Sequence, residues 1–261
     1  MKELTISIIS CNQCHDLKKL LPSLIPAAKH IDAEILLIDN RSNDATSEYI
    51  HQYYPEIQVT YNPDITGYGE NHNINLSKAR GRYFVAMNSD MLVENSVFVQ
   101  LFDYMDTHPD IGIISPKVLS EDGSIQGLNK RYPTLLDLFL RRFVNNPPRI
   151  LQKVVQHRLD YYEMRDVGYD RICDVEFLSG AFMFCRAELL KSIGGFDPQY
   201  FLYFEDVDLC RRVQRTHRTT YFPFVSVTHY WKRSAHINWK FTLYFIRSAY
   251  RYFNKWGYSF S

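Results

Sequence analysis

The amino-acid sequence predicts an α/β fold in which helices flank a mostly parallel, Rossmann-like central sheet. Short apolar runs alternate with amphipathic stretches over residues 1–90, which is the pattern of repeated strand–helix–strand units. The run at residues 83–87 is apolar throughout, as expected of a strand buried on both faces. Asp39 and Asp90 follow the ends of two such runs, where open α/β sheets bind their ligands.

The first half of the chain alternates regularly between strands and helices. Strands are predicted at residues 4–10, 34–38, 57–61 and 83–87, and helices at residues 16–28, 45–53 and 74–80. Pro22 and Pro26 should bend or break the first helix, because proline cannot donate the backbone hydrogen bond. Residues 67–73, GYGENHN, lack the spacing of a dinucleotide fingerprint and are predicted to be a flexible loop with amides near a diphosphate.

The second half has a less regular pattern. Helices are predicted at residues 96–108, 150–162, 187–193 and 205–213, strands at 111–115, 175–178, 181–185 and 220–227, and a hairpin at 118–127. The hairpin turns at Asp122-Gly123, and Gly194-Gly195 ends the third of these helices. Residues 131–171, interrupted by Pro147-Pro148, are interpreted as the variable part that shapes the substrate site.

Composition narrows the possible functions. A chain of 261 residues suits one large domain or two joined halves, and 30 Lys+Arg against 29 Asp+Glu gives no reason to expect nucleic-acid binding. The odd count of 5 Cys, the start of the chain directly in a strand and the lack of a long apolar run predict a reduced, cytoplasmic protein. Cys11 and Cys14 form a lone CxxC, which we interpret as incidental thiols.

Four polar residues are candidates for chemistry, and each has a purely structural alternative. Asp90 could hold a divalent cation or cap a turn, and Asp39 could bind a base or ribose or simply cap residues 39–44. Asp206, near a helix start, could be a general base, or Glu205-Asp206 could stabilise the helix dipole. Asp208 can pair with Arg211 or Arg212, and His229 is either a metal ligand or structural.

Three motifs between Leu4 and about Trp231 resemble glycosyltransferase family 2, the inverting GT-A enzymes, and most specifically the rhamnosyltransferase-like branch. The motifs are LLIDNRSNDAT at 36–46, GYGENHNINLSKARGRYFVAMNSD at 67–90 and LSGAFMFCRAELLKSIGGFDPQYFLYFEDVDLCRR at 178–212. The resemblance implies a GT-A fold and a nucleotide-sugar donor.

The resemblance also implies roles for individual residues. Asp39 matches the nucleotide contact, Asp90 the ligand of a DxD-type metal motif, Asp206 the catalytic base and His229 a second metal ligand. Further donor contacts are expected from Asn40, Ser42, Gly67, Asn71 and Asn88, and substrate contacts from Ser179, Gly180 and Glu205. Asn88 departs from the motif, which usually has Asp there, so one negative charge is missing and metal affinity is expected to be modest.

The reaction implied is transfer of a sugar, with inversion, to a hydroxyl of a saccharide or lipid-linked saccharide in bacterial surface polysaccharide synthesis. dTDP-rhamnose is the favoured donor, UDP-glucose and UDP-galactose stay open, and the cofactor is Mg²⁺ or Mn²⁺. A sugar nucleotidyltransferase is the alternative, although SCNQCHD at residues 10–16 is not the Gly-rich, basic loop expected of one. A non-catalytic carbohydrate-binding protein is disfavoured by the presence of both Asp90 and Asp206.

The predicted division is a catalytic domain at residues 1–235 and a C-terminal amphipathic helix at 236–261. The catalytic domain comprises a nucleotide-sugar half, 1–92, and an acceptor half, 93–235. The helix has a basic side and an aromatic side, with Lys240, Arg247, Arg251 and Lys255 on the first and Phe241, Phe245, Ala249, Tyr252 and Trp256 on the second. Either the aromatic side packs on the catalytic domain, or the helix lies on the inner face of an anionic membrane.

Overall fold

The computed structural model describes residues 2–143, 148–230 and 239–259, and the side chains of residues 142 and 143 lie outside the description. The strands are β1 Lys2–Ser10, β2 Ala33–Asn40, β3 Gln58–Asn62, β4 Gly81–Met87, β5 Met91–Val93, β6 Ile111–Leu119, β7 Asn129–Lys130, β8 Cys173–Asp174, β9 Phe177–Leu178, β10 Phe182–Arg186 and β11 Arg218–His229. The helices are α1 Cys14–Ala28, α2 Thr46–Tyr53, α3 Tyr68–Lys78, α4 Val97–Thr107, α5 Leu135–Phe143, α6 Arg149–Tyr162, α7 Ala187–Ser192, α8 Glu205–Val213 and α9 Trp239–Trp256.

Within the described residues, nine strands form one sheet whose path runs β3-β2-β1-β4-β10-β6-β11-β5, with β8 beside β11. The strands β3, β2, β1 and β4 pair in parallel, as the alternating pattern predicts. Beyond β4 the sheet is mixed, because β10 runs antiparallel to both β4 and β6. The predicted parallel arrangement therefore describes the first half of the sheet, and one continuous sheet joins both halves of the chain.

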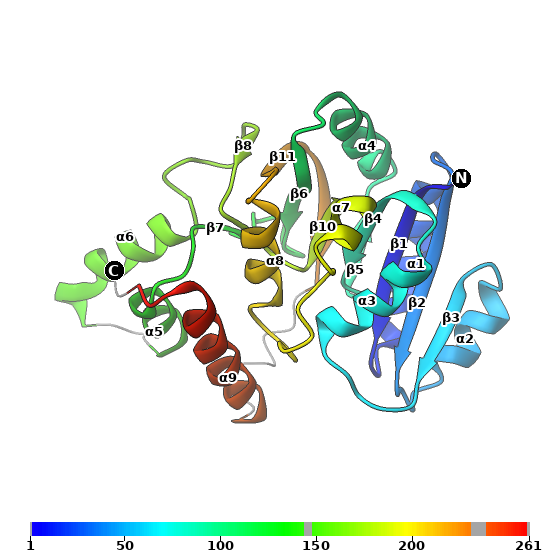
Figure 1. Ribbon diagram of the computed structural model, residues 1–261, viewed down its shortest axis with the longest axis horizontal. Helices are drawn as coiled ribbons and strands as arrows, with labels where there is room; N and C mark the ends of the chain where they lie inside the picture. Colours follow the sequence, from blue (N-terminus) through cyan, green and yellow to red (C-terminus); the bar gives the residue numbers. More distant parts are fainter. Residues whose placement is uncertain (1, 144–147, 231–238, 260–261) are drawn as a thin grey trace.

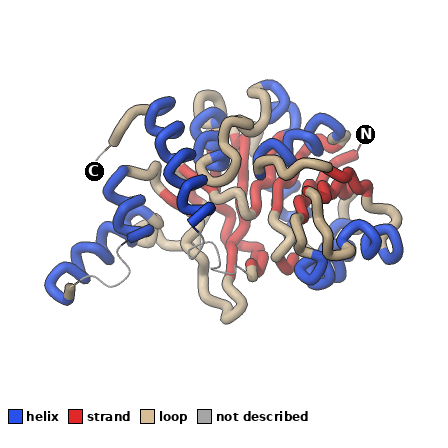
Figure 2. The backbone as a smooth tube through the Cα atoms, turned by 90° about the horizontal axis from the view of Figure 1, so that it is seen from below, coloured by secondary structure: helices blue, strands red, loops and turns tan. Residues whose placement is uncertain are grey.

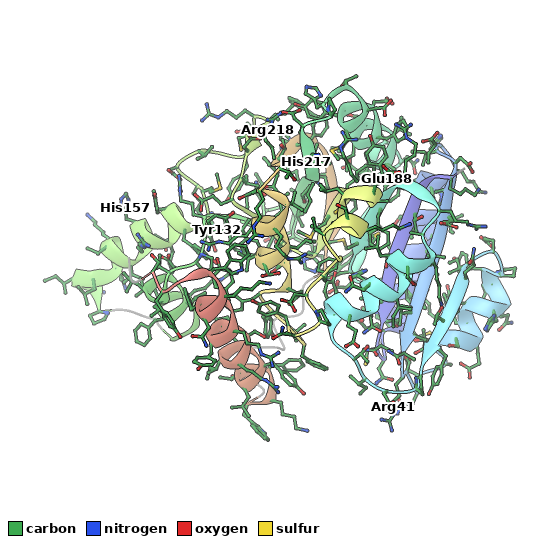
Figure 3. All side chains as sticks on the ribbon, viewed as in Figure 1. Arg41, Tyr132, His157, Glu188, His217 and Arg218 are labelled. Carbon is green, nitrogen blue, oxygen red and sulfur yellow. The ribbon has the colours of Figure 1, made fainter. Side chains whose placement is uncertain are left out.

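Helices cover both faces of this sheet (Figure 1). α1 contacts α4 and β5, whereas α3, α7 and α8 contact one another and the strands from the other face. Each face buries its own apolar cluster, so the core has two layers. α5, α6 and α9 gather at one end of the molecule, away from β1 to β3, and helices at that end extend past the strands in the view from below (Figures 1 and 2).

The prediction of a flexible loop at residues 67–73 is wrong, because α3 already begins at Tyr68. The two glycines serve close packing there: a Cβ on Gly67 would lie 2.8 Å from the Phe201 carbonyl oxygen, and one on Gly69 would lie 2.6 Å from the Phe196 Cβ. The Asn71 side-chain amide donates to the Gly67 carbonyl at 2.9 Å and holds the first turn. The first predicted helix also continues unbroken through Pro22 and Pro26.

Other local predictions are confirmed. The hairpin turns at Gly123, whose φ of 80° is in the left-handed region, and it brings Ile125 opposite Leu119. The predicted helix at residues 150–162 is α6, and residues 135–143 form a further helix, α5.

The C-terminal helix α9 packs its aromatic side on the catalytic domain. Tyr252 and Phe253 are buried, and the Trp256 indole donates to the Asp208 carboxylate at 2.8 Å. The predicted basic side is divided by this packing, because Lys255 pairs with Asp208 at 2.8 Å. Trp239, Leu243, Ile246 and Tyr250 form an exposed apolar stripe, which we call the outer stripe of α9.

Candidate active site

A pocket of about 810 Å³ lies where β4, β9, β11 and the start of α8 meet. Its lining includes nine of the residues that the sequence singles out: Asn40, Asn71, Asn88, Asp90, Ser179, Gly180, Glu205, Asp206 and His229. Asp39 and Ser42 instead line a second hollow of about 640 Å³ beside Tyr61, and Gly67 packs against Phe201. The two predicted acidic site residues Asp90 and Asp206 therefore share one pocket, although they are far apart in the sequence.

Asp39 is buried at 2% exposure and uses its carboxylate to hold its own turn. One oxygen accepts a hydrogen bond from the Ser42 backbone N–H at 2.8 Å, and the other accepts from the Ser47 hydroxyl. This is the capped turn that the sequence offers as the structural alternative. The contact between Asp39 and a nucleotide stays a prediction.

Asp206 stands in the first turn of α8 with both carboxylate oxygens fixed. The Gly180 backbone N–H donates to one oxygen at 2.9 Å and the Val207 N–H to the other at 2.9 Å. Tyr203 and Phe204, just before the helix, both have left-handed φ angles of 68° and 67°, which is a strained conformation for aromatic residues. Burial raises the pKa of Asp206, and the Gly180 hydrogen bond opposes that shift.

Glu205 lies beside Asp206 and is 5% exposed. Burial, together with the negative charge of Asp206, raises the pKa of Glu205 well above its ordinary value. Its Oε2 atom has no hydrogen-bond partner among the residues that the structure describes. The two neighbouring carboxyl groups thus share a pocket wall, and the negative charge of Asp206 disfavours the charged form of Glu205.

His229 and Asp90 face each other at the other side of the pocket. His229 Nε2 lies 3.3 Å from an Asp90 carboxylate oxygen and 3.2 Å from the Asn88 side-chain nitrogen. His229 Nδ1 lies 2.9 Å from the Gln126 side-chain oxygen, so a proton on Nδ1 leaves the Nε2 lone pair directed at the site. No third His, Cys, Asp or Glu joins this pair within residues 2–143, 148–230 and 239–259.

The two possible metal ligands at this side, Asp90 and His229, fit a hard divalent cation that is shared with a substrate. Mg²⁺ commonly takes one or two protein carboxylates together with substrate phosphates, and imidazole and carboxylate both suit Mn²⁺. The hydrogen bond from Nδ1 to Gln126 is the arrangement that orients histidine ligands in metal sites.

Sequence reasoning missed Gln126, Lys130, Arg141 and Tyr68, which also line the pocket. Tyr68 donates to the Gly180 carbonyl at 2.7 Å, in the peptide unit next to the one that binds Asp206. Gln126 lies within the predicted hairpin at 118–127, and Lys130 lies just before the irregular stretch that begins at residue 131, so neither position has a local signal of a site residue. Their positions depend on contacts with residues about 50 to 100 positions away, as in the pairing of Gln126 with His229.

None of the helices in the described parts of the chain combines the length and the apolar character needed to cross a membrane.

Comparison with known proteins places these features in a family. Residues 3–249 match the model described as Glycosyltransferase like family 2. The chain is 27% identical over 231 residues to N-acetylglucosaminyl-diphospho-decaprenol L-rhamnosyltransferase of Mycobacterium tuberculosis, covering 82% of this chain and 71% of the relative. It is 25% identical over 256 residues to rhamnosyltransferase WbbL of Escherichia coli K12, covering 95% and 91%.

Solved structures share the fold. The mannosyltransferase PcManGT of Pyrobaculum calidifontis, solved with GDP-Man and Mn²⁺, superposes with a TM-score of 0.65 at 14% identity over 97% of this chain. The chain spans 64% of that protein, which is less than two thirds of its length. The shared sheet, the pocket at its edge and the match over nearly the whole chain lead to one conclusion: this chain belongs to Glycosyltransferase like family 2 and is a glycosyltransferase with the GT-A fold.

Proposed function

We propose that the enzyme transfers a sugar from a nucleotide-sugar donor to a hydroxyl of a saccharide or lipid-linked saccharide, with inversion, in bacterial surface polysaccharide synthesis. The favoured sugar is rhamnose from dTDP-rhamnose, because two relatives are named rhamnosyltransferases. UDP-glucose and UDP-galactose are the alternative donors. The observation that carries this proposal is Asp206, a fixed carboxylate with a raised pKa that lines the large pocket.

In the proposed reaction Asp206 is the general base. The backbone N–H groups of Gly180 and Val207 fix both of its oxygens and leave one lone pair on each for the acceptor hydroxyl. The acceptor oxygen forms a bond to the anomeric carbon while its proton passes to Asp206. The bond from that carbon to the nucleoside diphosphate breaks on the opposite face, and the diphosphate leaves with the electron pair.

The donor is proposed to bind between Asp90 and the first half of the sheet, with contacts from Asn40, Asn71 and Asn88. Asp90 and His229 would hold Mg²⁺ or Mn²⁺, which supplies positive charge for the departing diphosphate when it is bound. Ser179, Gly180 and Glu205 would contact the sugars. On this scheme residues 1–92 form the donor half, 93–235 the acceptor half and 236–261 a peripheral segment.

The outer stripe of α9 supports a second part of the proposal, which is contact with the inner face of an anionic cell membrane. Trp239, Leu243, Ile246 and Tyr250 are 67%, 53%, 52% and 63% exposed. Exposed Arg247 flanks the stripe and would lie near lipid headgroups. All five cysteines are free, in keeping with a cytoplasmic enzyme.

Purified enzyme with a panel of nucleotide sugars and a lipid-linked N-acetylglucosaminyl diphosphate acceptor tests the reaction. We expect dTDP release and a rhamnosylated product from dTDP-rhamnose, at rates above those with UDP-glucose or UDP-galactose. Faster transfer from a UDP-sugar would show that the enzyme uses that sugar rather than rhamnose. Release of pyrophosphate from dTTP and a sugar phosphate, without glycosyl transfer, would overturn the proposal in favour of a nucleotidyltransferase.

A further inference from the structure

Lys130 is a buried cation in the active-site pocket. The antiparallel pairing of β7 with β9 places it opposite Phe177, and its Nζ atom lies 5.1 Å from the centre of the Phe177 ring. The residue is 4% exposed, its backbone pairs with Phe177, and its ammonium group forms no ion pair with a carboxylate among the residues that the structure describes. An ammonium group buried without a paired carboxylate is costly, so this position suits an anionic ligand.

A second cation stands near Lys130. Arg141, on α5, lines the same pocket and is close enough for its charge to disfavour the charged form of Lys130. Its neighbour there is Tyr162, a buried tyrosine whose neutral hydroxyl does not cancel the guanidinium charge. By contrast, Arg158 on the adjacent helix α6 is paired with Asp137 at 2.6 Å.

The nearby carboxylates are already occupied. Glu163 pairs with Arg165 at 2.9 Å, and the Asp206 oxygens accept the two backbone hydrogen bonds described above. Lys130 and Arg141 therefore bring two cationic groups to a pocket whose described carboxylates are Asp90, Glu205 and Asp206, and of these three Asp206 is the one whose charge affects the pKa of Lys130. A doubly charged anion such as a diphosphate would balance these cations.

Asp206 is close both to this cationic part of the pocket and to the part that contains Tyr68. After burial, the charges that affect the pKa of Lys130 are those of Arg141, Glu163 and Asp206. Those that raise the pKa of Tyr68, besides burial, come from Glu205, Asp206 and Asp90. Asp206 belongs to both sets, so its charge acts on Lys130 and on Tyr68. Apolar side chains of α5 and α9, including Leu138, Phe241 and Phe245, continue the lining of the pocket.

We propose that Lys130 and Arg141 form an anion-binding subsite that holds the diphosphate of a lipid-linked saccharide acceptor, with its lipid directed along α5 and α9. The inference rests on the proposed function, because Asp206 then receives the proton of the sugar hydroxyl next to that diphosphate. The diphosphate of the donor has the same chemistry, so the two sources must be separated by experiment.

The subsite makes acceptor binding dependent on pH. Burial and the charge of Arg141 lower the pKa of Lys130 to about 7, while Glu163 and Asp206 oppose the shift; Tyr162 also faces this group and stays neutral. A bound phosphate favours the charged ammonium, so affinity is full below pH 7 and falls as the pH rises above 7. Arginine stays charged throughout this range, so Lys130→Arg should keep its affinity at about pH 8.5.

The test compares two acceptors in the full-length enzyme: an N-acetylglucosaminyl diphosphate with a short alkyl chain, and the neutral octyl N-acetylglucosaminide. We measure KM and kcat for each acceptor, and by calorimetry the Kd of the diphosphate acceptor and of dTDP. Lys130→Met and Arg141→Met should weaken binding of the diphosphate acceptor about 10- to 100-fold. This loss should be at least about tenfold larger than the loss of affinity for the neutral acceptor. Lys153→Met, on the exposed side of α6, is the matched control and should behave like wild type.

The outcomes separate the alternatives. Weaker dTDP binding with unchanged acceptor binding would assign the cations to the donor and overturn the proposal. Equal losses with both acceptors, or no loss of affinity above pH 7 in the wild type, would also overturn it. If wild type transfers no sugar to either acceptor but binds the alkyl diphosphate through Lys130, the proposed function fails while the subsite stands. Lys130→Arg keeps the test valid if Lys130→Met does not fold.

Discussion

Residues 2–93 and residues 94–259 build the two sides of the active-site pocket in different ways. In the first half, four parallel strands end at one edge, and Asn40, Asn88 and Asp90 stand at or just after the ends of β2 and β4. In the second half, the pocket residues come from short elements that meet across the sequence, as where Gly180 binds Asp206 and Gln126 binds His229. Regular strand–helix units position the first side, and long-range contacts position the second.

Selected carboxylates of the two halves also differ in their surroundings. In the first half, the Asp39 carboxylate accepts hydrogen bonds from within its own turn and the start of α2. In the second half, Glu205 and Asp206 line the pocket and have raised pKa values. Burial of carboxyl groups beside each other costs stability, and such groups concentrate where proton transfer occurs. We propose from this difference that the first half holds the donor and the second half performs the proton transfer, a division that the following experiments test.

The largest effect is expected at Asp206. Asp206→Asn keeps the shape of the side chain and one oxygen that can accept a backbone hydrogen bond. The amide cannot take the acceptor proton, so kcat should fall by about 10²- to 10⁴-fold. dTDP binding and the melting temperature should stay near wild type. Asp103→Asn, on the exposed side of α4, is the control. Turnover within threefold of wild type by a folded Asp206→Asn enzyme would break the proposed division.

The next effect concerns stability and the attachment of α9 to the second half. Buried Asp208 pairs with Arg212 at 2.8 Å and with Lys255 at 2.8 Å, and it accepts the Trp256 hydrogen bond. Asp208→Ala should lower the free energy of unfolding in urea by about 3–5 kcal/mol, because it leaves the largely buried guanidinium of Arg212 without its carboxylate partner. Asp197→Ala, which removes the other partner of Lys255, should cost less. A loss below about 1 kcal/mol for Asp208→Ala would show that α9 is only loosely attached.

A smaller effect is expected where the two halves meet at the proposed metal ligands. Gln126→Leu removes the partner of His229 Nδ1 and should weaken Mn²⁺ affinity about 10- to 100-fold, measured by calorimetry with dTDP present. EDTA should abolish sugar transfer by the wild type, and added Mg²⁺ or Mn²⁺ should restore it. The same ions should not restore transfer in the Asp90→Ala variant. Gln100→Leu on exposed α4 is the control. Full activity in EDTA contradicts the metal proposal, and unchanged Mn²⁺ affinity in Gln126→Leu contradicts the role of that residue.

The smallest effect on folding is expected for the outer stripe of α9. Leu243→Ser with Ile246→Ser should reduce sedimentation with anionic liposomes and leave the melting temperature unchanged, because both side chains are exposed. Leu92→Ser, an exposed position on β5, should not alter liposome binding. If intact protein does not bind anionic vesicles at low salt, the membrane proposal is wrong and α9 only packs on the catalytic domain.

The sequence by itself determined the parallel strands of the first half and the start of α8 at Glu205-Asp206, and it limited the partner of Asp208 to Arg211 or Arg212, of which the structure has Arg212. These features depend on patterns within a few residues: apolar runs ended by polar residues, and charged residues four apart on a helix. The same local information placed Asp90 at a strand end. It also left two alternatives open for Asp39, since a turn cap and a nucleotide contact require the same residue.

Only the tertiary structure decided which polar groups share the pocket. Gly67 precedes helix α3 and Gly69 lies in its first turn, and the chain at Phe201 and Phe196 packs closely against them, a contact that no local pattern encodes. Likewise Gln126, Lys130 and Arg141 look like ordinary surface residues in the sequence, and they become site residues because strands and helices distant in the chain enclose them. Burial and electrostatic environment are properties of such long-range packing, and they raise the pKa of Asp206 and lower the pKa of Lys130.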